Sequence, residues 1–315
     1  MEENNELIDL NDFQNMVQEI CDENNIKMKV ISRNWIMMLE KGDVHRFIVG
    51  CRFDSNNHGL GMALDDKFAT YEVLHNLNIP IAYHEILYSS KNKAKHAIGA
   101  NSIQNAYDFF EKYNHNMVIK VNDGSQGKNC YHITKKSDIK KVTKKLFKRH
   151  YSLSLCPYYE IKNEYRIIML DGKKQIMYQK IRPAVVGDGI HTIKELLTTL
   201  NEHYFKDKLK SLKYKRVLAK GEKFEYNWQF NLSHGAVINE NIPAALEKKL
   251  LKIAMDVSKK LSINFVSVDI IDTTEGLMVL EINSGVATGH YRKLKEDGPA
   301  IAKKMYEKAI LKMFE

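Results

Sequence analysis

The chain has 315 residues, of which 44% are hydrophobic, 28% charged and 10% aromatic. This length leaves room for about two domains of roughly 150 residues each, and the apolar content can fill their cores. These values exclude a short binding peptide and a mostly disordered chain. No segment approaches the roughly 18 uninterrupted apolar residues of a membrane helix, and the acidic start MEENNELIDLND is unlike a signal peptide. We therefore expect a folded cytoplasmic protein with no membrane partner.

The net charge of +9 comes from two lysine-rich runs, residues 134–150 and 205–223. Such runs either attract polyanions or anionic substrates, or form solvated helix faces and loops, and charge alone does not decide between these. The cysteines lie far apart with no CxxC pair, and no histidine pair has metal-ligand spacing on a helix. We expect reduced, packed thiols at Cys21, Cys51, Cys130 and Cys156.

The first part of the chain reads as a helix followed by three strands. Apolar spacing predicts a helix over residues 6–22, and strands are expected over 27–32, 35–40 and 45–50. Residues 61–87 then predict one helix that begins with an acidic turn, a break at Pro80 and a short strand. This segment alternates helix and strand.

From about residue 100 the pattern predicts a compact unit of alternating helices and strands. Helix 102–113, strand 117–121, a glycine-containing loop, strand 130–134, a lysine-rich helix and strand 153–158 follow in order. A longer block then contains strands 164–170 and 174–181, joined by Asp171 and Gly172, a pair that favours a tight hairpin turn. It ends with helix 243–261, strands 265–272 and 277–283, and helix 299–314, without internal repeats.

Acidic residues interrupt the last two strands. Asp269 stands in an otherwise apolar strand, and Glu281 and Asn283 project from one face of the next. If residues 272–277 form a hairpin, Asp269 lies opposite Glu281, and two adjacent carboxylates require a cation. Two carboxylates and an amide oxygen suit Mg²⁺ shared with substrate phosphates. The alternative is a capped strand end or salt bridges to lysines.

The loop in VIKVNDGSQGKNCYHI contains Gly124, Ser125 and Gly127, which allow backbone amides to approach a phosphate. It is not a Walker loop, because its glycine spacing differs and a strand follows it. An ordinary hairpin turn is the alternative interpretation. Lys120, at the end of the preceding strand, and Lys67 could each meet a phosphate, although single lysines are usually solvent-exposed.

A polar face is also predicted on the strand EYRIIML. Glu164 and Arg166 share this face, and Lys180 and Arg182 lie near the end of the hairpin partner. A guanidinium can hold phosphate oxygens with two hydrogen bonds, and a carboxylate can hold ribose hydroxyls. Cross-strand ion pairing explains the same pattern equally well.

Together these segments resemble the ATP-grasp superfamily, most closely the ATP-grasp module of cyanophycin synthetases and bifunctional glutathione synthetases. The resemblance covers about residues 60–290, and its most specific part is the run RPAVVGDGIHTIKEL. It implies an α+β ATP-grasp fold that holds a nucleotide between two α+β subdomains, after a small N-terminal α/β segment. The implied parts are residues 1–98 with the first ATP-grasp helix, a lid subdomain over 99–156, and a catalytic, metal-binding subdomain over 157–315.

The resemblance also implies roles for individual residues. Arg166, Arg182 and Asn231 would act in catalysis, the two arginines on the γ-phosphate and acyl phosphate. The metal ligands would be Asp269, Glu281 and Asn283, holding two Mg²⁺ ions for which Mn²⁺ is an acceptable substitute. The nucleotide ATP would be bound by Lys67, Lys120, Gly124, Ser125, Gly127, Lys128, Tyr159, Glu160 and Glu164, with Glu164 on the ribose.

Three departures from the family pattern concern the adenine and acceptor sides. The hinge that contacts adenine begins with Pro157 instead of an acidic residue. The usual Asn-x-Ser-x-Gly-Gly reads Asn231 to Ala236 as NLSHGA, and SGVATGHY replaces the Pro-Gly that commonly follows Glu-x-Asn. We therefore expect an unusual acceptor, handled by a stand-alone module.

The resulting prediction is an ADP-forming carbon–nitrogen ligase that joins a small-molecule carboxylate to an amine through an acyl phosphate. The substrate would be an amino acid, a peptide or a related small acid, and a homodimer is left open. The alternatives are an ATP-grasp-type small-molecule kinase and a basic nucleic-acid-binding module. We do not expect nucleic acid as a partner, because the lysine runs lack interleaved aromatic residues except Phe147 and Tyr214.

Overall fold

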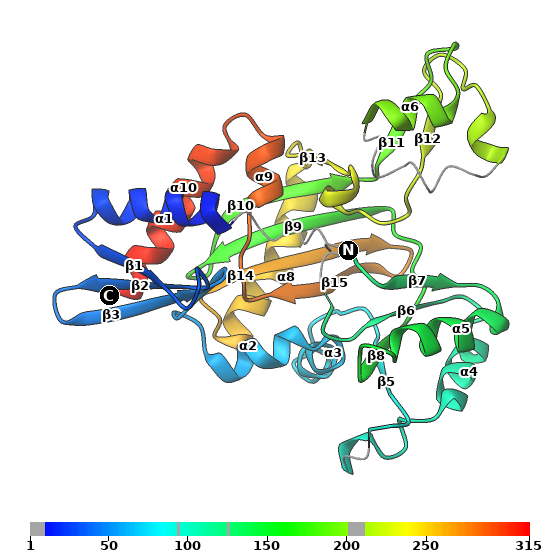
Figure 1. Cartoon of the computed structure of the whole chain (residues 1–315), viewed down its shortest axis with the longest axis horizontal. Coiled ribbons are helices and arrows are strands. Elements are labelled where there is room, and N and C mark those ends of the chain that lie inside the picture. The colour runs from blue at the N-terminus through cyan, green and yellow to red at the C-terminus, as the bar shows by residue number, and fades with distance from the viewer. Residues whose placement is uncertain (1–9, 93–94, 125–126, 201–211) are drawn as a thin grey trace. The chain divides into compact units, whose positions relative to one another are not determined.

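The computed structural model describes residues 10–92, 95–124, 127–200 and 212–315 (Figure 1). The chain divides into two compact units, the first made of Met1–Gln179 and Glu240–Glu315 and the second of Lys180–Asn239. The structure has the predicted α+β character, with helices and antiparallel sheets. The three-part division into residues 1–98, 99–156 and 157–315 stays a prediction.

The first unit begins with a helix packed beside a small antiparallel sheet. Its elements are α1 (Leu10–Glu23), β1 (Lys27–Ile31), β2 (Ile36–Lys41), β3 (Val44–Val49) and β4 (Arg52–Phe53), and the strands pair in chain order. The predicted helix and three strands are confirmed over the described residues. Phe53 contacts Phe265 edge to face with ring centroids 5.0 Å apart, and Phe13 contacts Tyr306. These aromatic contacts attach the segment to the later strands and helices of the unit.

The predicted single helix after residue 60 is wrong in one respect, because it is two helices. These are α2 (His58–Asp65) and α3 (Lys67–Asn76), separated by Asp66 in an extended conformation. The Asp66 carboxylate accepts a hydrogen bond of 2.7 Å from the Ala69 backbone N–H and so caps α3. Asp65 therefore ends the first helix, and Asp66 caps the start of the second.

A four-stranded antiparallel sheet follows, in the order β5-β8-β6-β7. Its elements are β5 (Glu85–Tyr88), β6 (Met117–Val121), β7 (Cys130–Ile133) and β8 (Ser152–Pro157), with η1 (Lys95–Ala97), α4 (Ile103–Lys112) and α5 (Lys136–Leu146). One face packs on both helices through Ile119, Leu153 and Leu155. The opposite face carries Lys120 and Ser154, which are direct cross-strand partners.

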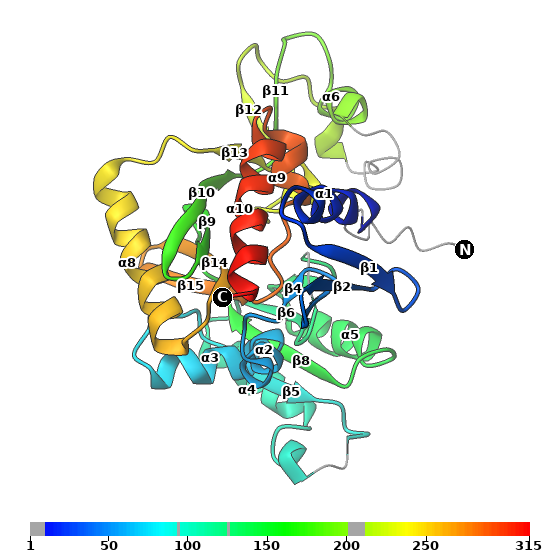
Figure 2. The same cartoon turned by 90° about the vertical axis from the view of Figure 1, so that its left-hand side faces the viewer.

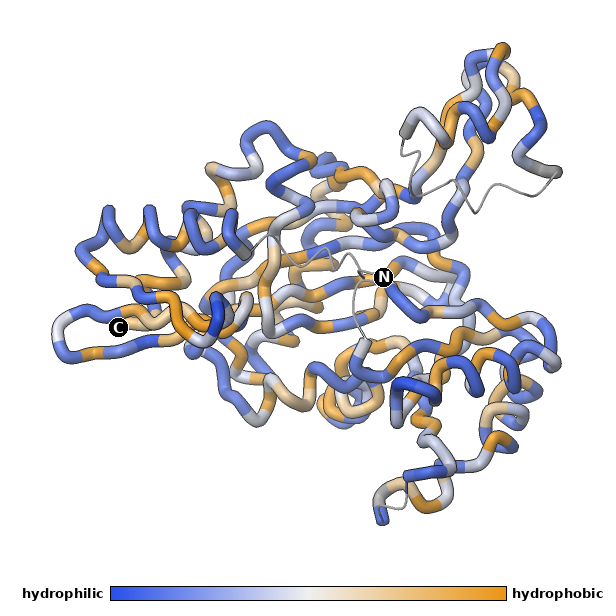
Figure 3. Tube along the Cα trace, viewed as in Figure 1, coloured by the Kyte–Doolittle hydropathy of each residue, from blue (hydrophilic) through white to orange (hydrophobic). Residues whose placement is uncertain are grey.

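The central sheet of the first unit contains the long hairpins predicted from the sequence. The strands β10 (Lys173–Ile181), β9 (Asn163–Leu170), β14 (Phe265–Thr273) and β15 (Gly276–Asn283) lie side by side in that order. Asp171 and Gly172 have φ values of 50° and 69°, which fits the predicted tight turn. Figure 3 shows hydrophobic positions recurring along these strands.

Helices lie against both faces of the central sheet. The apolar face is covered by α8 (Ala244–Leu261), whereas α9 (Gly289–Leu294) and α10 (Gly298–Met313) contact Tyr178 and Phe265 on the other face. Leu250, Ala254 and Val257 of α8 pack against Ile167 and Val268, and Figure 2 shows α8 lying along one side of these strands. The polar residues Arg166 and Asp269 lie next to these apolar positions in sequence, on the other face.

The second unit was not distinguished by sequence analysis. It contains β11 (Ala184–Val186) paired with β12 (Lys223–Glu225), and α6 (Ile193–Leu200), η2 (Leu212–Lys215), η3 (Leu232–His234) and β13 (Val237–Asn239). Val185, Ile193, Leu197 and Leu218 form its small core. Such a core is weakly apparent in a sequence, because its strands have only three residues each.

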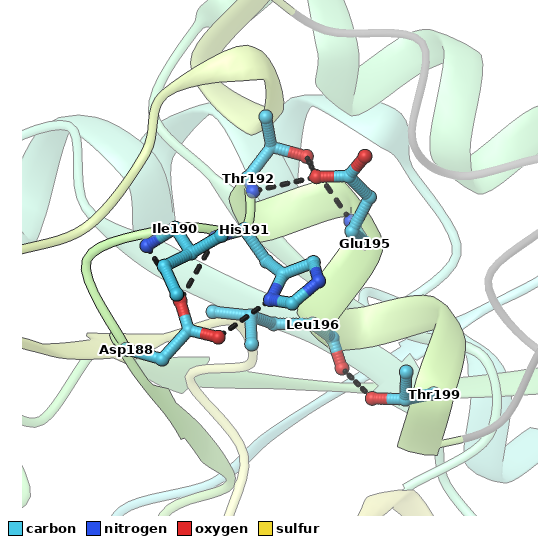
Figure 4. Close-up of polar contacts among 7 residues, drawn as sticks. All are labelled: Asp188, Ile190, His191, Thr192, Glu195, Leu196 and Thr199. Carbon is cyan, nitrogen blue, oxygen red and sulfur yellow. Dashed lines mark hydrogen bonds and ion pairs between the residues drawn. The ribbon is translucent and has the colours of Figure 1, made fainter.

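The loop before α6 is held by two side-chain hydrogen-bond systems (Figure 4). The Asp188 carboxylate accepts from the backbone N–H groups of Ile190 and His191 and pairs with His191 Nδ1. Glu195 accepts from the backbone N–H and hydroxyl of Thr192, and the Thr192 hydroxyl accepts from Glu195 N–H. This is a capping box, so much of the specific run GDGIHTIKEL has a structural role.

We expect Asp188→Asn to return the pKa of His191 toward its ordinary value of 6.5. In the folded chain the His191 ring donates a hydrogen bond to the Asp188 carboxylate, which raises the pKa of His191 and lowers that of Asp188. The ion pair therefore stabilises the folded loop at pH values between the ordinary pKa of Asp188 and that of His191. This stabilisation is lost as pH rises through the raised pKa of His191. NMR titration of the His191 ring measures the shift, and an unchanged pKa in Asp188→Asn contradicts the assigned pairing.

Candidate functional site

The predicted pairing of the two acidic strands is confirmed. Asp269 on β14 lies directly opposite Glu281 on β15, and Ser267 lies opposite Asn283. A register shift follows between Asp269 and Ile270, so the hairpin is irregular next to the carboxylates. The Asn283 side-chain N–H donates to Glu281 Oε1 at 3.2 Å. The two carboxylates and the amide thus form one cluster at the end of the hairpin.

The Asp269 carboxylate is held by Arg166 of the neighbouring strand β9. Arg166 Nε donates to Oδ1 at 2.7 Å and Nη2 donates to Oδ2 at 2.6 Å, a two-point ion pair between directly opposed residues. The Asp269 side chain is only 2% exposed and that of Arg166 is 22% exposed. Burial alone would lower the pKa of Arg166, but the charge of Asp269 and its hydrogen bonds, together with Tyr178 and Glu281, outweigh burial and raise that pKa.

This pair changes the interpretation of the acidic strands. The cation expected beside Asp269 is supplied within the protein, by an arginine rather than by the lysines that the salt-bridge alternative named. Arg166 therefore has a clear structural role, in addition to any role in binding phosphate.

The cluster nevertheless fits a divalent cation that prefers oxygen ligands. A carboxylate has about four lone-pair sites, and the two-point pair with Arg166 uses two of those on Asp269. Glu281 accepts only the Asn283 bond among the described residues, and the Asn283 amide oxygen remains available. Within the part of the chain that the structure describes, no group of three or more His, Cys, Asp or Glu residues has metal-binding geometry. A metal here would thus need the amide or substrate oxygens.

Two lysines from different elements meet beside the loop that follows β6. The Lys67 ammonium, at the start of α3, donates to the Asn122 carbonyl at 3.2 Å and also to the Gly124 carbonyl. Burial and the nearby charge of Lys120 lower the pKa of Lys67, whereas Glu281 acts to raise it. The structure therefore brings together both predicted phosphate-side lysines and the carboxylate cluster.

Asn122 is a site residue that sequence analysis missed. It is 1% exposed, and its side chain accepts from Phe68 N–H and donates to Asp66 Oδ2 at 2.6 Å. Its own carbonyl accepts from both the backbone and the side chain of Lys67. Asn122 thus fastens the start of α3 to the end of β6, and an asparagine directly after a buried strand was the available signal.

The rest of the predicted nucleotide loop has a mixed outcome. A Cβ on Gly124 would lie only 3.0 Å from the Val121 Cβ, so a side chain there would be crowded. Gly127 has a positive φ of 64°, and Lys128 is exposed. Ser125 lies outside the described residues. Their roles in binding ATP stay predictions.

The predicted adenine hinge lies between β8 and β9. The Tyr159 hydroxyl accepts a hydrogen bond of 3.0 Å from Tyr83 N–H, so the ring is directed into the protein. Glu160 is exposed, while Glu164 on β9 is 7% exposed and shares the face of Arg166. Glu164 is therefore the more enclosed of the two carboxylates proposed for nucleotide binding.

Arg182 and Asn231 belong to the second unit and are described within it alone. Arg182 pairs with Glu225 at 3.2 Å and lies over the Phe230 ring, 4.7 Å from its centroid. Asn231 Oδ1 accepts from the Ser233 backbone and hydroxyl and so begins η3. Gly235 ends this turn with a φ of +93°, and a Cβ there would collide with the Tyr226 hydroxyl. The NLSHG motif thus forms a fixed turn.

The first lysine run forms a solvated helix face. In α5 the apolar Ile139, Val142 and Leu146 are buried against the sheet, and the lysines alternate with them on the exposed side. Much of the second run lies outside the described residues. Cys21, Cys51 and Cys156 are buried free thiols, as expected, whereas Cys130 is only partly buried. Among the described residues, no helix is long and apolar enough to cross a membrane.

Comparison with known proteins supports the fold. Residues 215–309, less than a third of the chain, match the family model of the RimK-like ATP-grasp domain. The structure is similar to a bifunctional glutathione synthetase from Pasteurella multocida, with 15% identity, a TM-score of 0.54 and 93% of this chain covered. It is also similar to D-alanyl-alanine synthetase A from Vibrio cholerae O1 biovar eltor, with 12% identity, a TM-score of 0.55 and coverage of 91% of this chain and 89% of that one. The protein therefore has the ATP-grasp fold.

Two further findings concern the length of the matched proteins and the curated proteins. The chain spans 44% of the length of the glutathione synthetase. No curated protein matches the sequence. The resemblance to the ATP-grasp superfamily stated from the sequence is confirmed, and these distant similarities concern the fold.

Proposed function

We propose that this protein is an ADP-forming ligase that joins a small carboxylic acid to an amine. The carboxylate and amine are expected to come from amino acids, peptides or related compounds. ATP is the proposed co-substrate, and Mg²⁺ the proposed metal. The cytoplasm remains the proposed compartment.

The observation that carries the proposal is that Glu281, on β15, interacts with cations from two other elements. Its charge acts to raise the pKa of Lys67 on α3 and that of Arg166 on β9. Asp269 and Asn283 lie beside it. Cations for phosphate oxygens therefore adjoin an all-oxygen cluster suited to a divalent cation, which is the arrangement that phosphoryl transfer requires.

The proposed chemistry assigns most of the work to electrostatics and positioning. A substrate carboxylate oxygen would bond to the γ-phosphorus while the bond to the bridging oxygen of ADP breaks. Lys67 and Lys120 would neutralise phosphate oxygens, and Arg166 and Arg182 are proposed for the transferring phosphoryl group. Bound Mg²⁺, held by Asp269, Glu281 and Asn283, would supply further charge neutralisation. The amine nitrogen would then attack the acyl carbon, lose a proton and release phosphate.

The remaining predicted residues would orient the substrates. Glu164 is proposed for the ribose, and Tyr159 and Glu160 for the adenine side. The loop with Gly124, Ser125, Gly127 and Lys128 would lie along the triphosphate. Asn231 is proposed on the acceptor side, within the fixed NLSHG turn.

The test is a screen of amino acids and dipeptides, in pairs, for ADP release with ATP and Mg²⁺. Free phosphate is measured in parallel, and mass spectrometry identifies the product. Equal amounts of ADP, phosphate and an amide product support the proposal. ADP with a phosphorylated product and no free phosphate would instead identify a kinase.

A further inference from the structure

A buried histidine next to the two lysines takes no part in the function proposed above. His84 directly precedes β5 and is only 1% exposed. Its Nδ1 lies 2.6 Å from the Ser154 hydroxyl oxygen on β8. Its Nε2 is buried and has no hydrogen-bond partner among the described residues. A buried, unpaired ring nitrogen is costly, which points to a partner that binds there.

The hydrogen bonds of His84 and Ser154 indicate which nitrogen of the His84 ring carries the proton. Ser154 is fully buried, and within the described part of the chain its hydroxyl has His84 as its hydrogen-bond partner. A buried hydroxyl proton needs an acceptor, so Ser154 donates to Nδ1. The neutral ring then carries its proton on Nε2. The unpaired atom is therefore an N–H donor.

The charges around the ring are those of the lysine pair. Lys120 is the direct cross-strand neighbour of Ser154, on the same sheet face. Burial, together with Lys120 and Lys67, lowers the pKa of His84 well below its ordinary value, so the ring is uncharged at neutral pH. A neutral donor beside two ammonium groups complements an anion without adding a third repelling charge.

We infer that His84 is a third hydrogen-bond donor to the polyphosphate, with its Nε2–H directed at a phosphate oxygen held by Lys67 and Lys120. The inference deepens the proposed function and rests on it for the identity of the ligand as a nucleoside polyphosphate. Ser154 is the positioning residue, because its hydroxyl holds the ring in the tautomer that donates. The ligand class follows from the donors, which are the two ammonium groups and the His84 Nε2–H, and from the charges that act on the ring, which among the described residues are those of Lys120 and Lys67.

Two isosteric variants separate the two ring nitrogens. The amide nitrogen of His84→Gln reaches the position of Nε2 and keeps a donor there, whereas that of His84→Asn reaches only as far as Nδ1. Calorimetry with ADP, inorganic tripolyphosphate and adenosine compares both with the wild type. A hydrogen bond to a charged group is worth about 1.5–3 kcal/mol, so we expect His84→Asn to weaken ADP and tripolyphosphate binding about tenfold to a hundredfold. His84→Gln should stay within about threefold, and adenosine binding should not respond.

The contrary results are equally defined. Unchanged ADP and tripolyphosphate affinity in a folded His84→Asn protein overturns the inference, and so does an equal loss for adenosine. If His84→Asn does not fold, ¹⁵N NMR of the wild-type ring decides, because a proton on Nδ1 overturns the inference and a proton on Nε2 supports it. Amide formation with no effect of His84 on nucleotide affinity contradicts this inference alone. Tripolyphosphate binding that depends on His84, without any amide product, contradicts the proposed function alone.

Discussion

We expect Glu281→Gln to lower ATP turnover by about 10²-fold to 10³-fold, the usual cost of removing one charged group that stabilises a transition state. Both oxygens of Asp269 already accept bonds from Arg166, whereas Glu281 accepts only from Asn283 among the described residues. Glu281 is therefore the carboxylate most available to a metal ion. Glutamine keeps the size of the side chain and removes its charge. The rate of ADP release as a function of Mg²⁺ concentration measures the effect.

The matched control is Glu275→Gln, in the turn of the same hairpin. Glu275 is exposed and six residues from Glu281, so its substitution should leave turnover unchanged. The unfolding temperature of both variants should stay close to that of the wild type. Wild-type turnover by a folded Glu281→Gln protein would exclude the proposed metal site.

Local patterns were sufficient for much of the first unit. Short runs rich in apolar residues located β9, β14 and β15, and Asp171 and Gly172 indicated the turn between β9 and β10. The short turn sets the pairing next to it, with Thr273 opposite Gly276, but that register alone would place Asp269 opposite Leu280. The register shift between Asp269 and Ile270 brings Glu281 opposite Asp269, as the sequence predicted. Predictions succeeded where the interacting residues are joined by a short loop.

Predictions were incomplete where partners are distant in sequence. Arg166 and Asp269 are paired across two strands separated by about a hundred residues, and nothing local indicates which strands become neighbours. His84 and Ser154 meet through β5 and β8 in the same way. The split at Asp66 was missed for a different reason, because the capping hydrogen bond depends on an extended backbone at one residue. A helical pattern that continues on both sides conceals such a break.

The second large effect concerns stability, and it follows from the enclosed ion pair. We expect Arg166→Met to lower the free energy of unfolding by about 3–5 kcal/mol, because it leaves the Asp269 charge buried without its two-point partner. Methionine is close in length to the arginine stem, so most of the apolar packing is kept. Urea unfolding at neutral pH measures the difference. Turnover should fall as well, since Arg166 is also proposed to hold the transferring phosphoryl group.

Two comparisons distinguish the loss of charge compensation from a general loss of packing. Arg52→Met removes an exposed arginine–aspartate pair, with Asp65, in which both side chains are about half exposed, so it should cost no more than about 1 kcal/mol. Adding Asp269→Asn to Arg166→Met should restore part of the lost stability, because a buried amide is less costly than an unpaired buried carboxylate. If the double variant is as unstable as Arg166→Met alone, the loss comes from packing. The arginine would then have to be assigned to filling space on the sheet rather than to holding Asp269.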